Sequence, residues 1–205
     1  MSELKIISIK AGMQVNTRFY KVPSFLIKLG ENPSKNPVSE NEAKEYIKKY
    51  PNINHFVFYG EEPLKYKKEL ENFLESIWKD TYKITIHTDG GYPVLNVLSR
   101  NFRISLYIVN VRKNIDDKYI NSLRDLCVYS KDYLLGFKDH PETIIQNSED
   151  LIEKIKENTD EDFIKNYLKN NPPEEHLMFL PESIEETGKI KKICFSTGHY
   201  FRNIL

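Results

Sequence analysis

Cysteine is almost absent from this sequence. Only Cys127 and Cys194 occur among its 205 residues, and they lie far apart in the chain. Two isolated cysteines exclude a disulfide scaffold and a four-cysteine metal site. The five histidines show neither HxH nor HxxxH spacing, which are the spacings typical of zinc sites. We therefore predict no metal site and a reducing, cytoplasmic setting.

Long apolar runs and an excess of charge of one sign are also missing. No stretch approaches the roughly 18 apolar residues of a membrane-spanning helix, and the opening MSELKIISIK lacks the apolar centre of a secretory signal. Thirty basic and thirty acidic residues cancel. No overall field therefore attracts a polyanion, and we expect neither a membrane nor a nucleic acid as partner.

What the sequence does contain is a regular alternation of strand and helix patterns. Short apolar or alternating runs predict strands at residues 5–9, 22–29, 55–59, 83–88, 104–111, 133–138, 176–180 and 200–205. Amphipathic segments lie between most of them, and the capping box Ser39-x-x-Glu42 predicts a helix start. Such alternation favours right-handed crossovers and parallel strands. We predict one α/β domain over residues 1–205, an incomplete (β/α) barrel with a mostly parallel curved sheet and outer helices.

The turns that follow the predicted strands resemble those of a known enzyme family. FVFYGEEPL contains the turn Gly60–Pro63, and the later string ITIHTDGG contains Thr88 and Asp89. With YIVNVRK, YLLGFKDHPE, FLPES and GHYFRNIL, these strings resemble the radical S-adenosylmethionine (SAM) enzymes, and most closely the 7-carboxy-7-deazaguanine synthases of queuosine and deazapurine biosynthesis. The resemblance covers nearly the whole chain and implies a radical-SAM-like domain.

The resemblance also implies a ligand-binding mouth at the carboxyl ends of the strands. The residues that match family positions there are Gly60, Glu62, Thr88, Asp89, Lys138, Glu182 and Arg202. In the family, the glycine-rich turn and its glutamate receive the amino group of SAM. Here Glu61 replaces a glycine and Asp89 an asparagine, so we expect the mouth to prefer cationic or neutral ligands. The alternative is that Gly60–Pro63 is only a strand-to-helix turn, with its carboxylates beside a helix N-terminus.

The departures from the family bear on catalysis. Family members hold a [4Fe–4S] cluster with three cysteines, whereas the corresponding region here, LGENPSKNPVSENEAKEY, has none, and Glu31 stands about where the first thiolate would be. Oxygen ligands are poor substitutes because iron–sulfur clusters select thiolates. The family's N-terminal substrate loop is also missing, and Lys10–Met13 stands there. We predict no [4Fe–4S] cluster, no catalytic residues and no radical SAM reaction.

Two functional hypotheses follow from these residues. The first is a cluster-less, non-catalytic pseudoenzyme with no cofactor, which binds a protein partner, a second copy of itself as a dimer, or a small purine-like ligand or SAM. The second is an enzyme of deazapurine or nucleotide modification, such as a lyase, that acts with a partner. The missing cysteines favour the first. The Lys-, Asn-, Ile- and Tyr-rich composition is typical of an AT-rich genome, and a phage is among the sources it fits.

Overall fold

The structure is a computed structural model that describes residues 3–13, 19, 21–31, 37–92, 104–139, 141–159, 161–180, 184–197 and 200–201. The chain groups into two compact units. The first comprises Met1–Thr88 and Val94–Tyr107, and the second comprises Asp89–Pro93 and Ile108–Leu205. Strand β5 (Ile104–Asn110) begins in the first unit and ends in the second.

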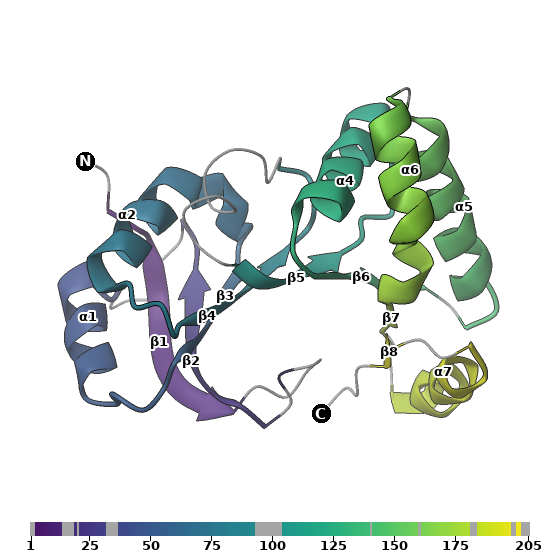
Figure 1. Cartoon of the computed structure of the whole chain (residues 1–205). Coiled ribbons are helices and arrows are strands. Elements are labelled where there is room, and N and C mark those ends of the chain that lie inside the picture. The colour runs from purple at the N-terminus through teal and green to yellow at the C-terminus, as the bar shows by residue number, and fades with distance from the viewer. Residues whose placement is uncertain are drawn as a thin grey trace. The chain divides into compact units, whose positions relative to one another are not determined.

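The first unit is a sheet with helices packed against it (Figure 1). Its other elements are β1 (Ile6–Met13), β2 (Pro23–Leu29), α1 (Glu40–Lys48), β3 (His55–Gly60), the short 3₁₀ helix η2 (Pro63–Tyr66), α2 (Lys67–Ile77) and β4 (Lys83–Thr88). Strands β2, β3 and β4 are parallel neighbours, in register Phe25 to Phe56 and Phe56 to Ile84. The predicted parallel sheet is thus confirmed here.

Strand β1 differs because it pairs antiparallel with β2. A parallel pair needs a crossover of a dozen or more residues, usually a helix. The connection from Met13 to Pro23 is shorter than that. A return in the opposite direction is therefore the arrangement that this chain length permits.

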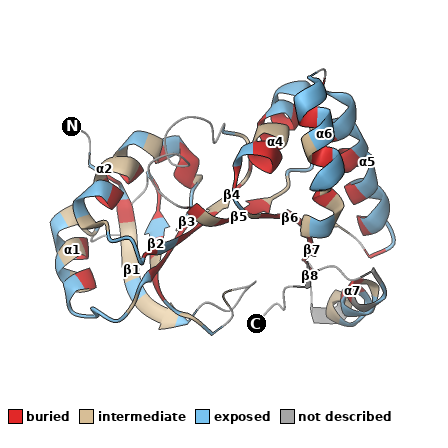
Figure 2. Cartoon of the chain, viewed as in Figure 1, coloured by how far each residue is buried: buried red, intermediate tan, exposed pale blue. Residues whose placement is uncertain are grey.

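The core of the first unit is aromatic. Phe25, Phe56, Phe58 and Phe73 are fully buried, and the Phe25 and Phe56 rings lie 5.2 Å apart. The run HFVFYG of β3 is buried at its first four residues because neighbours cover both of its faces (Figure 2). This continuous apolar run explains why β3 lies between two parallel strands.

Helix α1 begins as the sequence predicts. The Ser39 hydroxyl accepts a hydrogen bond from the backbone N–H of Glu42, and the Glu42 carboxylate accepts one from the backbone N–H of Ser39 at 2.8 Å. These bonds satisfy two amide groups at the start of the helix. The backbone N–H and the hydroxyl of Ser39 both donate to the Glu42 carboxylate and lower its pKa, since these bonds favour the charged form.

The second unit has the same α/β character. Its elements after β5 are α4 (Asp117–Tyr129), β6 (Tyr133–Phe137), α5 (Ile144–Glu157), α6 (Asp162–Asn170), the 3₁₀ helix η3 (Pro173–His176), β7 (Leu177–Phe179), α7 (Ile184–Thr197) and β8 (Tyr200–Phe201). Strands β6, β7 and β8 are parallel, and α4, α5 and α6 pack together (Figure 1). Strand β6 is buried throughout, and each of the three helices buries one stripe of residues.

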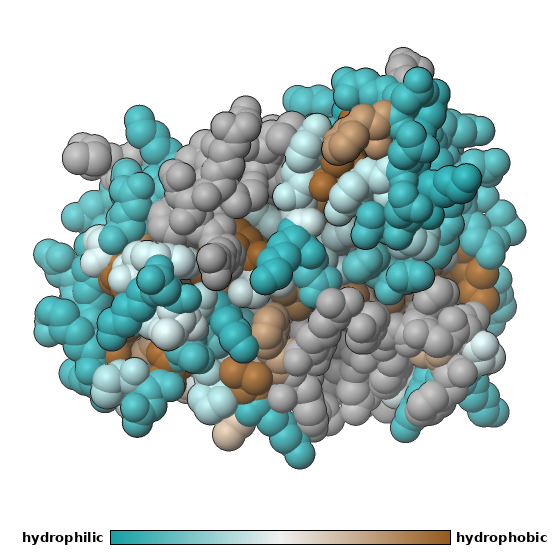
Figure 3. Space-filling model, viewed as in Figure 1, coloured by the Kyte–Doolittle hydropathy of each residue, from teal (hydrophilic) through white to brown (hydrophobic). Residues whose placement is uncertain are grey.

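Hydrophilic side chains dominate the outer surface around α6 (Figure 3). The described residues contain no helix long and apolar enough to cross a membrane. Residues 202–205 of the predicted last strand lie outside the described residues. The predicted α/β fold class with a mostly parallel sheet and flanking helices is confirmed.

Candidate ligand-binding turns

The turn after β3 requires glycine at position 60. Gly60 has a φ of +115°, a conformation that side chains with a Cβ rarely adopt. A Cβ at this position would also lie 2.4 Å from the backbone oxygen of Leu29. The same oxygen accepts a hydrogen bond from the N–H of Glu61 at 3.0 Å. The glycine is thus explained by backbone geometry and by close contact with β2.

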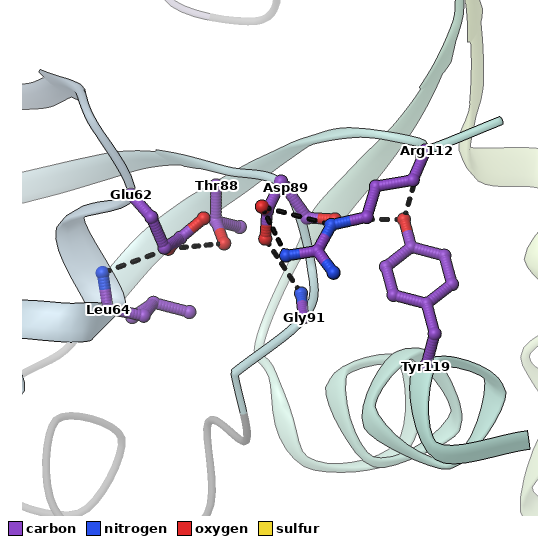
Figure 4. A network of polar contacts seen from close by, with 7 residues as sticks. All are labelled: Glu62, Leu64, Thr88, Asp89, Gly91, Arg112 and Tyr119. Atoms are coloured by element: carbon purple, nitrogen blue, oxygen red, sulfur yellow. Dashed lines mark hydrogen bonds and ion pairs between the residues drawn. The ribbon is translucent and has the colours of Figure 1, made fainter. Parts of the chain in front are cut away.

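Glu62 joins this turn to the end of β4. Its Oε1 accepts hydrogen bonds from the Leu64 N–H at 2.9 Å and from the Thr88 hydroxyl at 2.8 Å (Figure 4). Thr88 is buried at 2% exposure. Two of the residues predicted for the mouth therefore contact each other. Their hydrogen bonds give both a structural role that needs no ligand.

Glu61 belongs to a small ionic cluster. Its Oε2 accepts the backbone N–H of Glu31 at 2.8 Å, and its Oε1 lies 3.7 Å from the Lys65 ammonium. Lys65 also binds the Glu31 carboxylate at 2.6 Å. This contact lowers the pKa of the Glu31 carboxyl and raises that of Lys65. The Glu61 carboxylate therefore shares one cation with the Glu31 carboxylate, and the cluster keeps one negative charge.

Asp89 is held in a second network, within the second unit (Figure 4). Its Oδ1 accepts the Gly91 N–H at 2.9 Å, and its Oδ2 accepts from Arg112 Nε at 3.0 Å and Nη2 at 2.5 Å. The Tyr119 hydroxyl donates to the Asp89 carbonyl oxygen at 2.8 Å and accepts the Arg112 N–H at 3.0 Å. The Arg112 guanidinium lies 5.4 Å from the centre of the Tyr119 ring.

Arg112 was not among the residues predicted for the site. Its bidentate pairing neutralises Asp89, one of the two carboxylates on which the predicted preference for cationic or neutral ligands depended. The signal was present in the sequence, since Asp89 and Arg112 each come shortly after the carboxyl end of a strand. Lys65 was also missed, because it contacts Glu31 only once β2 and β3 are paired.

The other predicted residues fall in different places. Lys138 directly follows β6 and lines a cavity of about 500 Å³ in the second unit. Glu182 and Arg202 lie outside the described residues.

The cysteines are unsuited to hold an iron–sulfur cluster. Cys127 on α4 and Cys194 on α7 are both buried. Burial raises the pKa of the Cys127 thiol to about 12 and that of Cys194 to about 11. Cluster ligands are thiolates, and the described residues contain no group of three potential metal ligands. The residues present therefore do not fit a [4Fe–4S] cluster.

Comparison with known proteins shows the fold. No protein-family model and no curated protein sequence matches this chain. Among solved structures, it is similar to the crystal structure of QueE from Escherichia coli, with a TM-score of 0.62 at 13% sequence identity. The match covers 97% of this chain and 92% of QueE. The chain therefore has a QueE-like fold.

Proposed function

We propose that this protein is a cluster-less relative of the 7-carboxy-7-deazaguanine synthases and carries out no radical reaction. In this proposal it binds a protein partner, a small purine-like ligand or SAM. The ionic cluster of Glu31, Lys65 and Glu61 is the observation on which the proposal rests. QueE, whose fold this chain resembles, is a 7-carboxy-7-deazaguanine synthase.

The argument starts from what stands where the family binds its cluster. By the sequence resemblance, Glu31 takes the place of the first cluster cysteine, and in the structure it forms an ion pair with Lys65. An ammonium group at this position would repel the iron cations, and a carboxylate is a poor ligand for them. In this proposal a salt bridge occupies the position of the first cluster ligand.

The turns that would face SAM support binding more than chemistry. Gly60, Glu62 and Thr88 keep the identities of the family positions that they match, and Glu62 and Thr88 are hydrogen-bonded to each other. Asp89 is paired with Arg112, whereas Glu61 shares Lys65 with Glu31. Within the first unit one lysine faces the carboxylates of Glu31 and Glu61, so this turn keeps a net negative charge, which suits a cationic or neutral ligand.

Anaerobic reconstitution with iron and sulfide tests the proposal. We expect no stoichiometric iron, no visible charge-transfer band and no EPR signal on reduction, because no thiolate triad is present. The variant Lys65→Gln should likewise bind no stoichiometric iron and show neither signal, since removing the salt bridge does not create thiolates. About four irons per chain with cleavage of SAM would overturn the proposal and favour an enzyme that takes thiolates from a partner.

Calorimetry then distinguishes the two kinds of occupant. Titration with SAM, S-adenosylhomocysteine and a deazaguanine tests the small-ligand form of the proposal, and Glu61→Gly tests whether the added side chain blocks the turn. Heat from one of these ligands, increased by Glu61→Gly, would support a retained mouth. If every titration is flat in both proteins, the small-ligand form fails and a protein partner remains.

A further inference from the structure

The second unit contains a cavity whose lining is mainly basic. It measures about 500 Å³, within the range of roughly 300–1,000 Å³ that small-molecule sites occupy. It lies between the segments that follow β5 and β6 and one face of α5. Its cationic side chains are Arg112, Lys113, Lys138 and Lys154, and its anionic ones are Asp139 and Asp150. Arg112 is paired with Asp89, which is not part of the lining, so the three lysines exceed the two aspartates by one charge.

The positive charge is available to a ligand. Within the described part of the chain, the exposed Lys138 and Lys154 form no ion pair with a protein carboxylate. Asp150 is partly engaged, because its Oδ1 accepts a hydrogen bond from Gln146 at 2.7 Å. Arg112 is paired with Asp89, outside the cavity lining. The two lysines are therefore the groups that an anion would meet.

The rest of the lining suits an organic ligand. Phe137 and Leu151 supply apolar surface. The side-chain oxygen of Asn110 is buried and has no hydrogen-bond partner among the described residues. A buried polar atom without a partner costs free energy unless a ligand or a water satisfies it. A hydroxyl or N–H group of a ligand in the cavity would do so.

We propose that this cavity binds a small phosphorylated molecule, with its phosphate held by Lys138 and Lys154 and its remainder against Asn110 and Phe137. A phosphate monoester carries about −1.5 to −2 charges at pH 7, which matches the two charges of Lys138 and Lys154 together. A single carboxylate would leave one lysine unmatched. Lysine is also a common phosphate ligand as a point charge.

This site shares Lys138 with the predicted mouth but goes beyond the proposed function. It lies in the second unit, needs neither SAM nor a cluster, and its chemistry is that of an anion site. A failure of the cluster or SAM experiments leaves it untouched. Equally, a failure here leaves the cluster-less proposal in place.

Calorimetry with inorganic phosphate and ribose 5-phosphate tests the inference, with ribose as the uncharged control and succinate as the carboxylate control. We expect heat from ribose 5-phosphate and none from ribose. Lys138→Gln and Lys154→Gln should each weaken binding by about tenfold, since each removes a charge-assisted contact. Lys68→Gln makes the same change on the exposed face of α2 in the first unit and should leave the affinity unchanged.

Circular dichroism and thermal melting should show that all three variants fold like the parent protein. The inference fails if phosphate and ribose 5-phosphate titrate flat at millimolar concentration. It also fails if succinate binds as tightly as ribose 5-phosphate, or if Lys68→Gln reduces affinity as much as the two cavity variants do.

Discussion

The polar residues at the turns of this protein mainly stabilise the turns through hydrogen bonds and ion pairs. Glu62 and Thr88 bond to each other, Asp89 binds Arg112, and Glu61 contacts the Glu31 backbone and Lys65. Each contact fixes a loop that follows a parallel strand. A ligand at these turns would compete with bonds that the protein already makes, which favours weak, reversible binding over tight capture.

Gly60→Ala should destabilise the first unit. The change forces a Cβ into a positive-φ conformation and to within 2.4 Å of the Leu29 oxygen, so we expect a loss of at least about 1–3 kcal/mol in the free energy of unfolding. Gly188→Ala is the matched control. Nothing lies within 4 Å of a Cβ there, and the residue is inside α7, so this change should stabilise by roughly 0.5–1 kcal/mol. Urea unfolding measures both, and equal effects would contradict the argument.

His55 should make the protein sensitive to mild acid. Its ring is fully buried between the Ser24 and Thr85 hydroxyls, at 2.8 and 2.9 Å. The Ser24 hydroxyl donates to the Val22 carbonyl, so Nδ1 of the imidazole donates to Ser24 and Nε2 accepts from Thr85. Every polar group of the neutral ring thus has a partner. Burial, with a smaller contribution from the charge of Lys83, lowers the pKa of His55 from 6.5 to about 4.

The sign of the pH effect follows from that shift. Between pH 6.5 and about 4, His55 is protonated in the unfolded chain but stays neutral in the folded protein. The free energy of unfolding therefore falls as the pH falls, by roughly 3 kcal/mol at pH 4. His55→Gln should unfold more easily at pH 7 but lose this part of the slope. Unfolding by urea from pH 7 to 4.5 tests it, and NMR of the imidazole should show no titration above pH 5. A His55 titration near 6.5 would refute the prediction.

Whole elements were the part that the sequence predicted best. The capping box at Ser39 predicted the start of α1, and Lys83–Thr88 is a strand with the predicted bounds. Local hydrogen bonding and apolar patterning decide such features. The antiparallel β1 was missed because strand direction depends on the length of its connection to β2, and not on its own residues.

Tyr119→Phe should loosen the attachment of α4 to the turn after β4. The hydroxyl satisfies the carbonyl of Asp89 and the N–H of Arg112, and its loss leaves both backbone groups without this partner, at a cost of about 1–3 kcal/mol. Tyr129→Phe, on the same helix, removes a hydroxyl from a side chain that is 43% exposed, and should change stability by less than about 0.5 kcal/mol. Thermal unfolding compares the two variants, and a larger loss for Tyr129→Phe would disprove the assigned role.

At the scale of the whole molecule, the sequence predicted the fold class but not the pairings within the candidate site. Glu62 and Thr88 were chosen by their family positions, and the structure places them in contact. Arg112 and Lys65 were missed because their partners lie 23 and 34 residues away in sequence. Periodicity reports which face of an element is buried, whereas ion pairs depend on how separate elements are arranged.

The zero net charge of the chain predicts a property of the whole molecule. With thirty positive and thirty negative residues, electrostatic repulsion between copies is weakest near pH 7. Lys68→Glu combined with Lys192→Glu shifts the net charge by −4 at two exposed helix positions, and should raise the polyethylene glycol concentration that precipitates the protein at pH 7. Lys68→Arg with Lys192→Arg changes the same positions without changing the charge, and should precipitate with the parent protein. If the arginine pair raises solubility as much as the glutamate pair, charge is not the cause and a local surface contact between copies is responsible.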